Sequence, residues 1–142
     1  WISETELYYR IKTHFSELDV VPHGRPTWLG QQSLDVYLPS LNFGVEYQGV
    51  QHFKPISVFG GEAALEKNIE RDHRKMELAA ANGCSIVYVY EGYQFDDVRD
   101  LIEERIEGRK SYIEFKHVNR PREAEHLLNF SSNDDEEHDG KE

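Results

Sequence analysis

Alternating apolar and polar positions predict a β-hairpin in the first half of the chain. Residues 34–38 and 45–48 both follow the two-residue period of a strand with one covered face. The apolar face of the first strand would consist of Leu34, Val36 and Leu38. Residues 39–42 supply turn chemistry, and a symmetric loop of two or four residues there pairs positions whose numbers sum to 81. This register places Asp35 directly opposite Glu46.

Two carboxylates that face each other across a hairpin call for an explanation. Like charges in that position destabilise a sheet. At a separation of about 4 Å and an effective dielectric near 20, they repel by roughly 4 kcal/mol. A divalent cation would reverse this repulsion, whereas a shared proton would only relieve it. The alternative is a pair splayed into water, where the cost falls to roughly 1 kcal/mol.

The helical period of apolar residues predicts three helices. The first spans about 3–16, and Ser3 with Glu6 has the spacing of a capping box at its start. The second spans 62–82 and stops at Gly83. The third is capped by Asp96 or Asp97 and ends at Gly108.

The remaining segments predict one more strand and two loops. Residues 85–90 form a nearly continuous apolar run of β formers, which is typical of a strand covered on both faces and is our candidate for the central strand. Residues 17–31, rich in proline and glycine, read as a loop, with Trp28 at the edge of the core. Residues 49–61 read as an irregular bridge. Aromatic and basic residues interleave at 112–118, as either a docked strand or a nucleic-acid contact.

Some polar residues fall where a purely structural sequence would be apolar. Glu4 precedes Leu7 by one helical turn on the buried stripe of the first helix, as either a helix-dipole partner or a site residue. Asp72 lies on the buried stripe of the second helix, with Lys75 one turn later, and the alternative is an ion pair at the stripe's edge. His52 stands near the acidic pair, as either a structural histidine or a functional one.

Length and composition are consistent with one soluble domain. A chain of 142 residues can bury a sizeable core, and its single cysteine, Cys84, excludes an internal disulfide. No run is long and apolar enough for a membrane span, and the N-terminus has no signal pattern. We therefore expect a reducing, cytoplasmic compartment. Because the chain begins at Trp1, we also expect it to be part of a longer protein with further domains.

Charge divides the chain into three parts. The net charge is −11, and residues 131–142 hold six carboxylates against Lys141, as expected for an acidic disordered tail. Residues 109–130 form a C-terminal extension whose first part is basic. Residues 1–108 remain acidic and form the predicted main domain. Nucleic-acid affinity comes mainly from basic residues, so we expect this domain alone to bind DNA weakly.

The order helix, hairpin, helix, strand resembles the core of the PD-(D/E)XK nuclease superfamily. Local residues are similar to the branch that contains very-short-patch repair (Vsr-like) and related homing-type endonucleases. The resemblance covers residues 1 to about 95. The matching pieces, in order, are Glu4-x-x-Leu7-Tyr8, Leu34–Pro39, Val45–Gln48 with Gly49, Gln51, His52 and Phe53, Phe59-Gly60-Gly61, and Asp72-x-x-Lys75 before Gly83.

The resemblance implies a restriction-endonuclease-like α/β fold, with a mixed central sheet flanked by helices, and a Mg²⁺ or Mn²⁺ site. Asp35, Glu46 and the backbone carbonyl of Tyr47 would bind the metal, with Glu4 assisting. The signature lysine of the family is replaced by Gln48, which can orient a water but carries no positive charge. Other residues must then supply that charge.

The same resemblance assigns roles to residues outside the hairpin. Lys75 is the preferred replacement for the missing signature lysine, with Lys54 second. His52 matches a histidine that would serve as general base or leaving-group partner, and Asp72 would support the site.

We therefore predict a metal-dependent endodeoxyribonuclease, a hydrolase of bacterial or phage context. The expected catalytic residues are Glu4, Asp35, Glu46, Gln48, His52, Asp72 and Lys75. DNA is the expected partner, with RNA left open and no membrane. The alternative is a catalytically inactive member of the fold that binds nucleic acid or protein. A third reading, a nucleotide-binding or structural domain, has no positive support.

Overall fold

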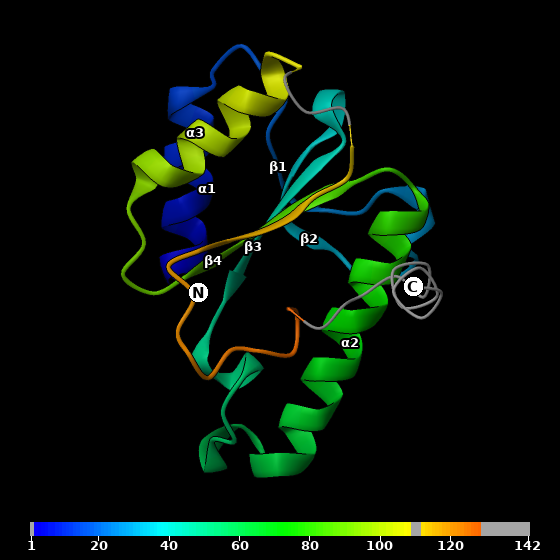
Figure 1. The fold of residues 1–142 in the computed structure, drawn as a ribbon, viewed down its shortest axis with the longest axis vertical. Coiled ribbons are helices and arrows are strands. Elements are labelled where there is room, and N and C mark those ends of the chain that lie inside the picture. Colours follow the sequence, from blue (N-terminus) through cyan, green and yellow to red (C-terminus); the bar gives the residue numbers. More distant parts are fainter. Residues whose placement is uncertain (1, 109–111, 129–142) are drawn as a thin grey trace, which may run out of the picture.

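The computed structural model describes residues 2–108 and 112–128, which form a mixed α/β fold around a five-stranded sheet (Figure 1). The strands follow the spatial order β1, β2, β3, β4, β5. Neighbours are antiparallel from β1 to β3 and parallel from β3 to β5. The strand bounds are β1 Val21–Gly24, β2 Leu34–Leu38, β3 Phe43–Gln48, β4 Ser85–Tyr90 and β5 Phe115–Val118.

Helices cover both faces of this sheet. The bounds are α1 Ile2–His14, α2 Gly61–Ala81 and α3 Phe95–Ile106. Figure 1 shows α1 and α3 together on one side and α2 on the other. The first face is filled by residues such as Ile11, Val45 and Ile102, and the second by residues such as Met76 and Tyr88. The prediction of a mixed sheet flanked by helices is therefore confirmed.

The hairpin has the predicted register. Val36 pairs with Val45 and Leu38 with Phe43, so paired positions sum to 81. The turn is a 3₁₀ segment, Pro39–Leu41, closed by Asn42 in the left-handed conformation with φ of 46°. The side chain of Asn42 accepts a 2.8 Å hydrogen bond from the Tyr37 hydroxyl. The sequence thus specified both the turn and the alignment of the two acidic positions.

The expected apolar face of β2 is wrong at one position. Leu34 packs with the α2 side of the sheet, whereas Val36 and Leu38 pack with the α1 and α3 side. Gly44 on β3 leaves room for Leu34 there. A Cβ atom added to Gly44 would lie only 3.0 Å from Leu34 Cδ2, so the leucine side chain occupies space that the glycine leaves open.

The segment predicted as a loop at 17–31 contains additional regular structure. It holds β1 at the sheet edge and a 3₁₀ turn, Thr27–Leu29. Pro22 and Gly24 hid the strand, because both residues normally mark turns, yet a proline is tolerated on an edge strand. The bridge at 49–61 is irregular as predicted, with 3₁₀ turns at Val50–His52 and Ser57–Phe59. Trp28 is partly buried against the core, also as predicted.

Two helix starts and the centre of the sheet differ from prediction. Helix α1 begins at Ile2, before the expected cap Ser3, and Glu6 forms an ion pair with Arg10 instead of a capping box. Helix α3 begins after Gln94, so the expected caps Asp96 and Asp97 lie in its first turn, where they favour the helix dipole. β4 is buried throughout, as predicted, but the middle strand is β3, since β1 adds a strand on the hairpin side.

The C-terminal extension takes part in the fold. β5 docks in parallel on β4, which confirms the docked-strand alternative, and Ala124 and Leu127 are buried against the α2 side of the core. The expected tail at 131–142 and the basic residues Arg109 and Lys110 lie outside the described residues. Cys84 is buried. Within residues 2–108 and 112–128, no helix has both the length and the apolar character needed to cross a membrane.

Candidate active site

A pocket of about 300 Å³ opens where the β2–β3 hairpin meets α1 and α2. Its walls come from β2, β3, the first turn of α1, the bridge after β3 and the middle of α2. The structure brings together there all eight residues that the sequence analysis predicted as catalytic or metal-binding, whereas Lys54, the second candidate for the missing lysine, is not among the lining residues. The lining residues are Ser3, Glu4, Asp35, Glu46, Tyr47, Gln48, Gly49, Gln51, His52, Asp72 and Lys75.

The hairpin acids exchange hydrogen bonds with the backbone of the opposite strand. The amide of Asp35 donates to Glu46 Oε2 at 3.0 Å, and the amide of Tyr47 donates to Asp35 Oδ2 at 2.7 Å. Glu46 is only 4% exposed. Burial raises the pKa of Asp35 well above its usual 3.8, and the neighbouring charge of Glu46 raises it further. Two ionised carboxylates are therefore unfavourable here unless a cation joins them.

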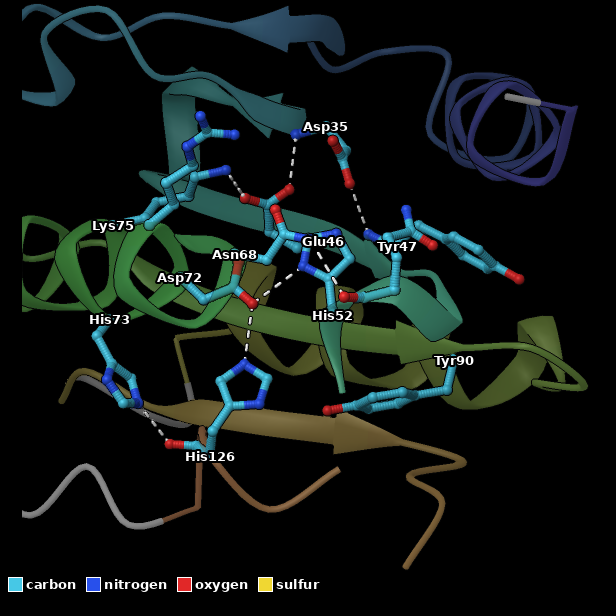
Figure 2. A network of polar contacts seen from close by, with 12 residues as sticks. Asp35, Glu46, Tyr47, His52, Asn68, Asp72, His73, Lys75, Tyr90 and His126 are labelled. Atoms are coloured by element: carbon cyan, nitrogen blue, oxygen red, sulfur yellow. Dashed lines mark hydrogen bonds and ion pairs between the residues drawn. The ribbon is translucent and has the colours of Figure 1, made fainter. Parts of the chain in front are cut away.

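Lys75 supplies one positive charge from α2. Its ammonium donates to Glu46 Oε1, and both side chains are largely buried (Figure 2). Burial alone would lower the pKa of Lys75, but the Glu46 carboxylate outweighs this effect and raises the pKa above 10.5. The predicted alternative, an ion pair between Lys75 and Asp72 one turn apart, gives way to this contact between helix and strand.

Asp72 joins two histidines from distant parts of the chain. Its Oδ2 atom accepts hydrogen bonds from His52 Nδ1 at 3.0 Å and from His126 Nε2 at 2.9 Å (Figure 2). Burial on its own would raise the pKa of Asp72, but these histidines outweigh it, so the pKa is lowered. The carboxylate is thus an acceptor, so in the neutral imidazole of His52 the proton lies on Nδ1 and Nε2 carries the lone pair.

Two side-chain oxygens in the pocket wall lack hydrogen-bond partners. Glu4 Oε1 and Gln48 Oε1 are buried and accept no hydrogen bond from the described residues. Buried polar atoms are nearly always hydrogen-bonded, so such an atom calls for a ligand or a water. Both residues line the same pocket as Asp35 and Glu46. The pocket therefore offers oxygen atoms that can still accept a ligand.

Sequence reasoning missed several residues at or near the site. His126 gave no local signal, because it lies 54 positions after Asp72. His23 lies between Pro22 and Gly24 in the unrecognised strand β1, and its Nδ1 is 3.3 Å from Glu4 Oε1. Ser3, Gly49 and Gln51 line the pocket as neighbours in sequence of predicted residues, which was the one available signal.

Comparisons with known proteins add little. No family model and no solved structure matches the chain. A stretch of 58 residues is 41% identical to "Uncharacterized protein 094L" of Frog virus 3 (isolate Goorha). That match covers 39% of this chain and 37% of the viral protein, and the printed name gives no activity.

Proposed function

We propose that this chain is a metal-dependent endonuclease domain that hydrolyses phosphodiester bonds in DNA. The observation that carries the proposal is the convergence of Asp35, Glu46 and Lys75 in one pocket, from two strands and a helix. Burial of acids beside a lysine costs desolvation free energy. Groups with perturbed pKa values are concentrated at functional sites.

The residues present fit a divalent cation. Asp35, Glu46 and the backbone carbonyl of Tyr47 would hold it, which matches the preference of Mg²⁺ and Mn²⁺ for oxygen ligands. The unused oxygen of Glu4 and the raised pKa of Asp35 both favour a positive charge in this pocket. A bound cation of this kind polarises the phosphodiester and lowers the pKa of an attacking water.

The chain's own side chains supply the remaining chemistry. Lys75 is anchored by Glu46. Its positive charge would stabilise the negative charge that builds up on the pentacoordinate phosphorus in the transition state. Gln48 is 4% exposed, and its unpartnered Oε1 can orient a water. His52, held by Asp72 through Nδ1, can accept a proton at Nε2 as general base or return one to the leaving oxygen.

The fold supports the same proposal at a finer level. The order α1, β2–β3 hairpin, α2, β4, α3 follows the helix, hairpin, helix, strand, helix order of a restriction-endonuclease-like core. Gln48 occupies the position of the signature lysine, and we propose that Lys75 replaces that lysine from α2. Substitution from a neighbouring element preserves the charge while changing its origin in the sequence.

Cleavage assays test the proposal directly. The full chain is incubated with supercoiled, linear and single-stranded DNA and with RNA, in Mg²⁺, Mn²⁺ or EDTA. We expect metal-dependent nicking of DNA that Asp35→Asn and Glu46→Gln abolish. Glu66→Gln serves as the matched control, because Glu66 is an exposed acid on α2 outside the pocket. A parent chain that cuts no substrate, or pocket variants that cut as well as the parent, would refute the catalytic role.

The alternative is a catalytically inactive fold that binds nucleic acid or protein. Two features favour this alternative: position 48 holds glutamine where the family signature has lysine, and the net charge is −11. It predicts that the chain binds a partner without cutting nucleic acid in any metal, and that Asp35→Asn leaves this binding unchanged. Binding measured beside cleavage on the same samples therefore separates the two functions.

A further inference from the structure

A second group of potential ligands lies on the outer side of Asp35. Glu4 from α1, His23 from β1 and Asp35 from β2 each offer one ligand atom, and these atoms lie within 4.8 Å of one another. Glu4 and Asp35 line the pocket, whereas His23 is not among its lining residues and has a side chain 69% exposed. Three separate elements thus bring one nitrogen and two oxygens close together, and small side-chain movements would let one metal ion contact all three.

One observation beyond the clustering points to a ligand there. Glu4 Oε1 is a buried atom that accepts no hydrogen bond from the described residues, and its one charged neighbour among them is His23 Nδ1 at 3.3 Å. A buried carboxylate oxygen without a hydrogen bond calls for a ligand or a water.

The charges around Asp35 also favour a cation on this side. Both oxygens of Glu46 are engaged, Oε2 by the amide of Asp35 and Oε1 by Lys75. Among the described contacts, no lysine forms an ion pair with Glu4 or Asp35. His23 adds a nitrogen to the two carboxylates on this side.

We propose that Glu4, His23 and Asp35 form a metal site that prefers divalent transition ions over Mg²⁺. Imidazole is a good ligand for Co²⁺, Ni²⁺ and Zn²⁺, whereas Mg²⁺ favours oxygen and keeps its own waters. The inference rests on the proposed function in that it shares Asp35 and Glu4 with the proposed metal site, and it concerns which metal the pocket takes.

Calorimetric titration of the full chain with CoCl₂ and with MgCl₂, without nucleic acid, tests this site. We expect Co²⁺ to bind at least about tenfold more tightly than Mg²⁺. His23→Asn should weaken Co²⁺ binding by about tenfold or more, since even outer-shell partners of metal ligands change affinity by about 10- to 100-fold. Asparagine tolerates the left-handed backbone of His23, with φ of 51°, so this variant should fold. His23→Asp replaces the nitrogen ligand by an oxygen ligand, so the difference in affinity between Co²⁺ and Mg²⁺ should become smaller.

The control is His14→Asn, because His14 is an exposed histidine on α1 that pairs with Glu103 away from the site. It should bind Co²⁺ like the parent. The inference fails if the parent binds both metals equally, or if His23→Asn binds Co²⁺ like the parent. Loss of Co²⁺ binding in His126→Asn alone would place the ion at the histidines around Asp72 and would equally overturn it.

These outcomes are separable from those of the proposed function. A chain that binds Co²⁺ through His23 and cuts no nucleic acid would refute the nuclease and leave the metal site standing. A chain that cuts DNA with Mg²⁺, while His23→Asn has no effect on Co²⁺ binding, would refute the metal site at His23 and leave the nuclease standing.

Discussion

Replacement of Lys75 by methionine tests the electrostatic structure of the pocket without any substrate. Methionine keeps the length and the helix propensity of lysine but removes the charge. The variant leaves Glu46 buried, with a side chain 5% exposed, and still close to Asp35. The free energy of unfolding should therefore fall, because a buried carboxylate loses its cation.

The size of the effect follows from the burial of the pair. Breaking a buried ion pair by removing one partner costs about 3–5 kcal/mol, against about 0–1 kcal/mol for an exposed pair. Lys75 is 17% exposed, and Glu46 Oε2 keeps its hydrogen bond from the amide of Asp35, so the low end applies. We expect a loss of about 3 kcal/mol. For a chain of this size that corresponds to a fall in Tm of about 6–12 °C.

Urea denaturation at pH 7 in EDTA measures this loss. Lys67→Met is the matched control, since Lys67 is exposed on the same helix, and its effect should stay within about 0.5 kcal/mol. The double variant Lys75→Met with Glu46→Gln removes the unpaired charge and should recover most of the stability. A Lys75→Met variant as stable as the control, or a double variant no better than Lys75→Met, would refute the reasoning.

Two further predictions concern pH. Because the pKa of Asp35 is raised above 3.8, the folded protein keeps a proton that the unfolded chain releases, so the stability of the metal-free protein should fall as pH rises through the folded pKa of Asp35. Asp35→Asn should lack this fall in denaturation curves and be the more stable protein at pH 7 in EDTA; an unchanged pH profile would contradict it. Burial and then the nearby Arg120 lower the pKa of His117 from 6.5 to about 4. The unfolded chain therefore takes up a proton before the folded protein does, so the free energy of unfolding should fall as pH falls from 6.5 to 4. NMR titration of the His117 ring should give a midpoint near 4, and a midpoint near 6.5 would contradict the structure.

Short-range patterns allowed most of the fold to be predicted. The β2–β3 register followed from the turn residues and the two-residue period, and α2 followed from its apolar stripe and from Gly83. β1 was missed because Pro22 and Gly24 resemble turn residues, and only pairing with Tyr37 and Val36 makes the segment a strand. The position of Leu34 also depends on a partner in another strand, Gly44, and no local pattern reports it.

The same distinction between local patterns and distant contacts applies to the site. Polar residues on a buried stripe, Glu4 and Asp72, were detectable because burial without a partner is costly. Their partners were less accessible, since His23 and His126 come from segments without a periodic signal. Lys75 was expected to replace a missing lysine, but its contact with Glu46 was not predicted. The contact of His126 with Asp72 emerges only when β5 brings the C-terminal segment back beside α2. Contacts between distant segments were therefore the main feature that the sequence did not predict.

Helix α2 connects the two halves of the proposed chemistry. Asp72 and Lys75 lie one turn apart, about 4.5 Å along the helix axis, on the same face. Asp72 holds His52, and Lys75 holds Glu46, so one rigid helix positions both the proton acceptor and the positive charge. Met76, fully buried beside them, fixes that helix on the sheet. Under the proposed function, a shift of α2 would disturb the base and the cation together, and a lysine on this helix would serve in place of one on β3 because its position is set by the same packing that sets the histidine.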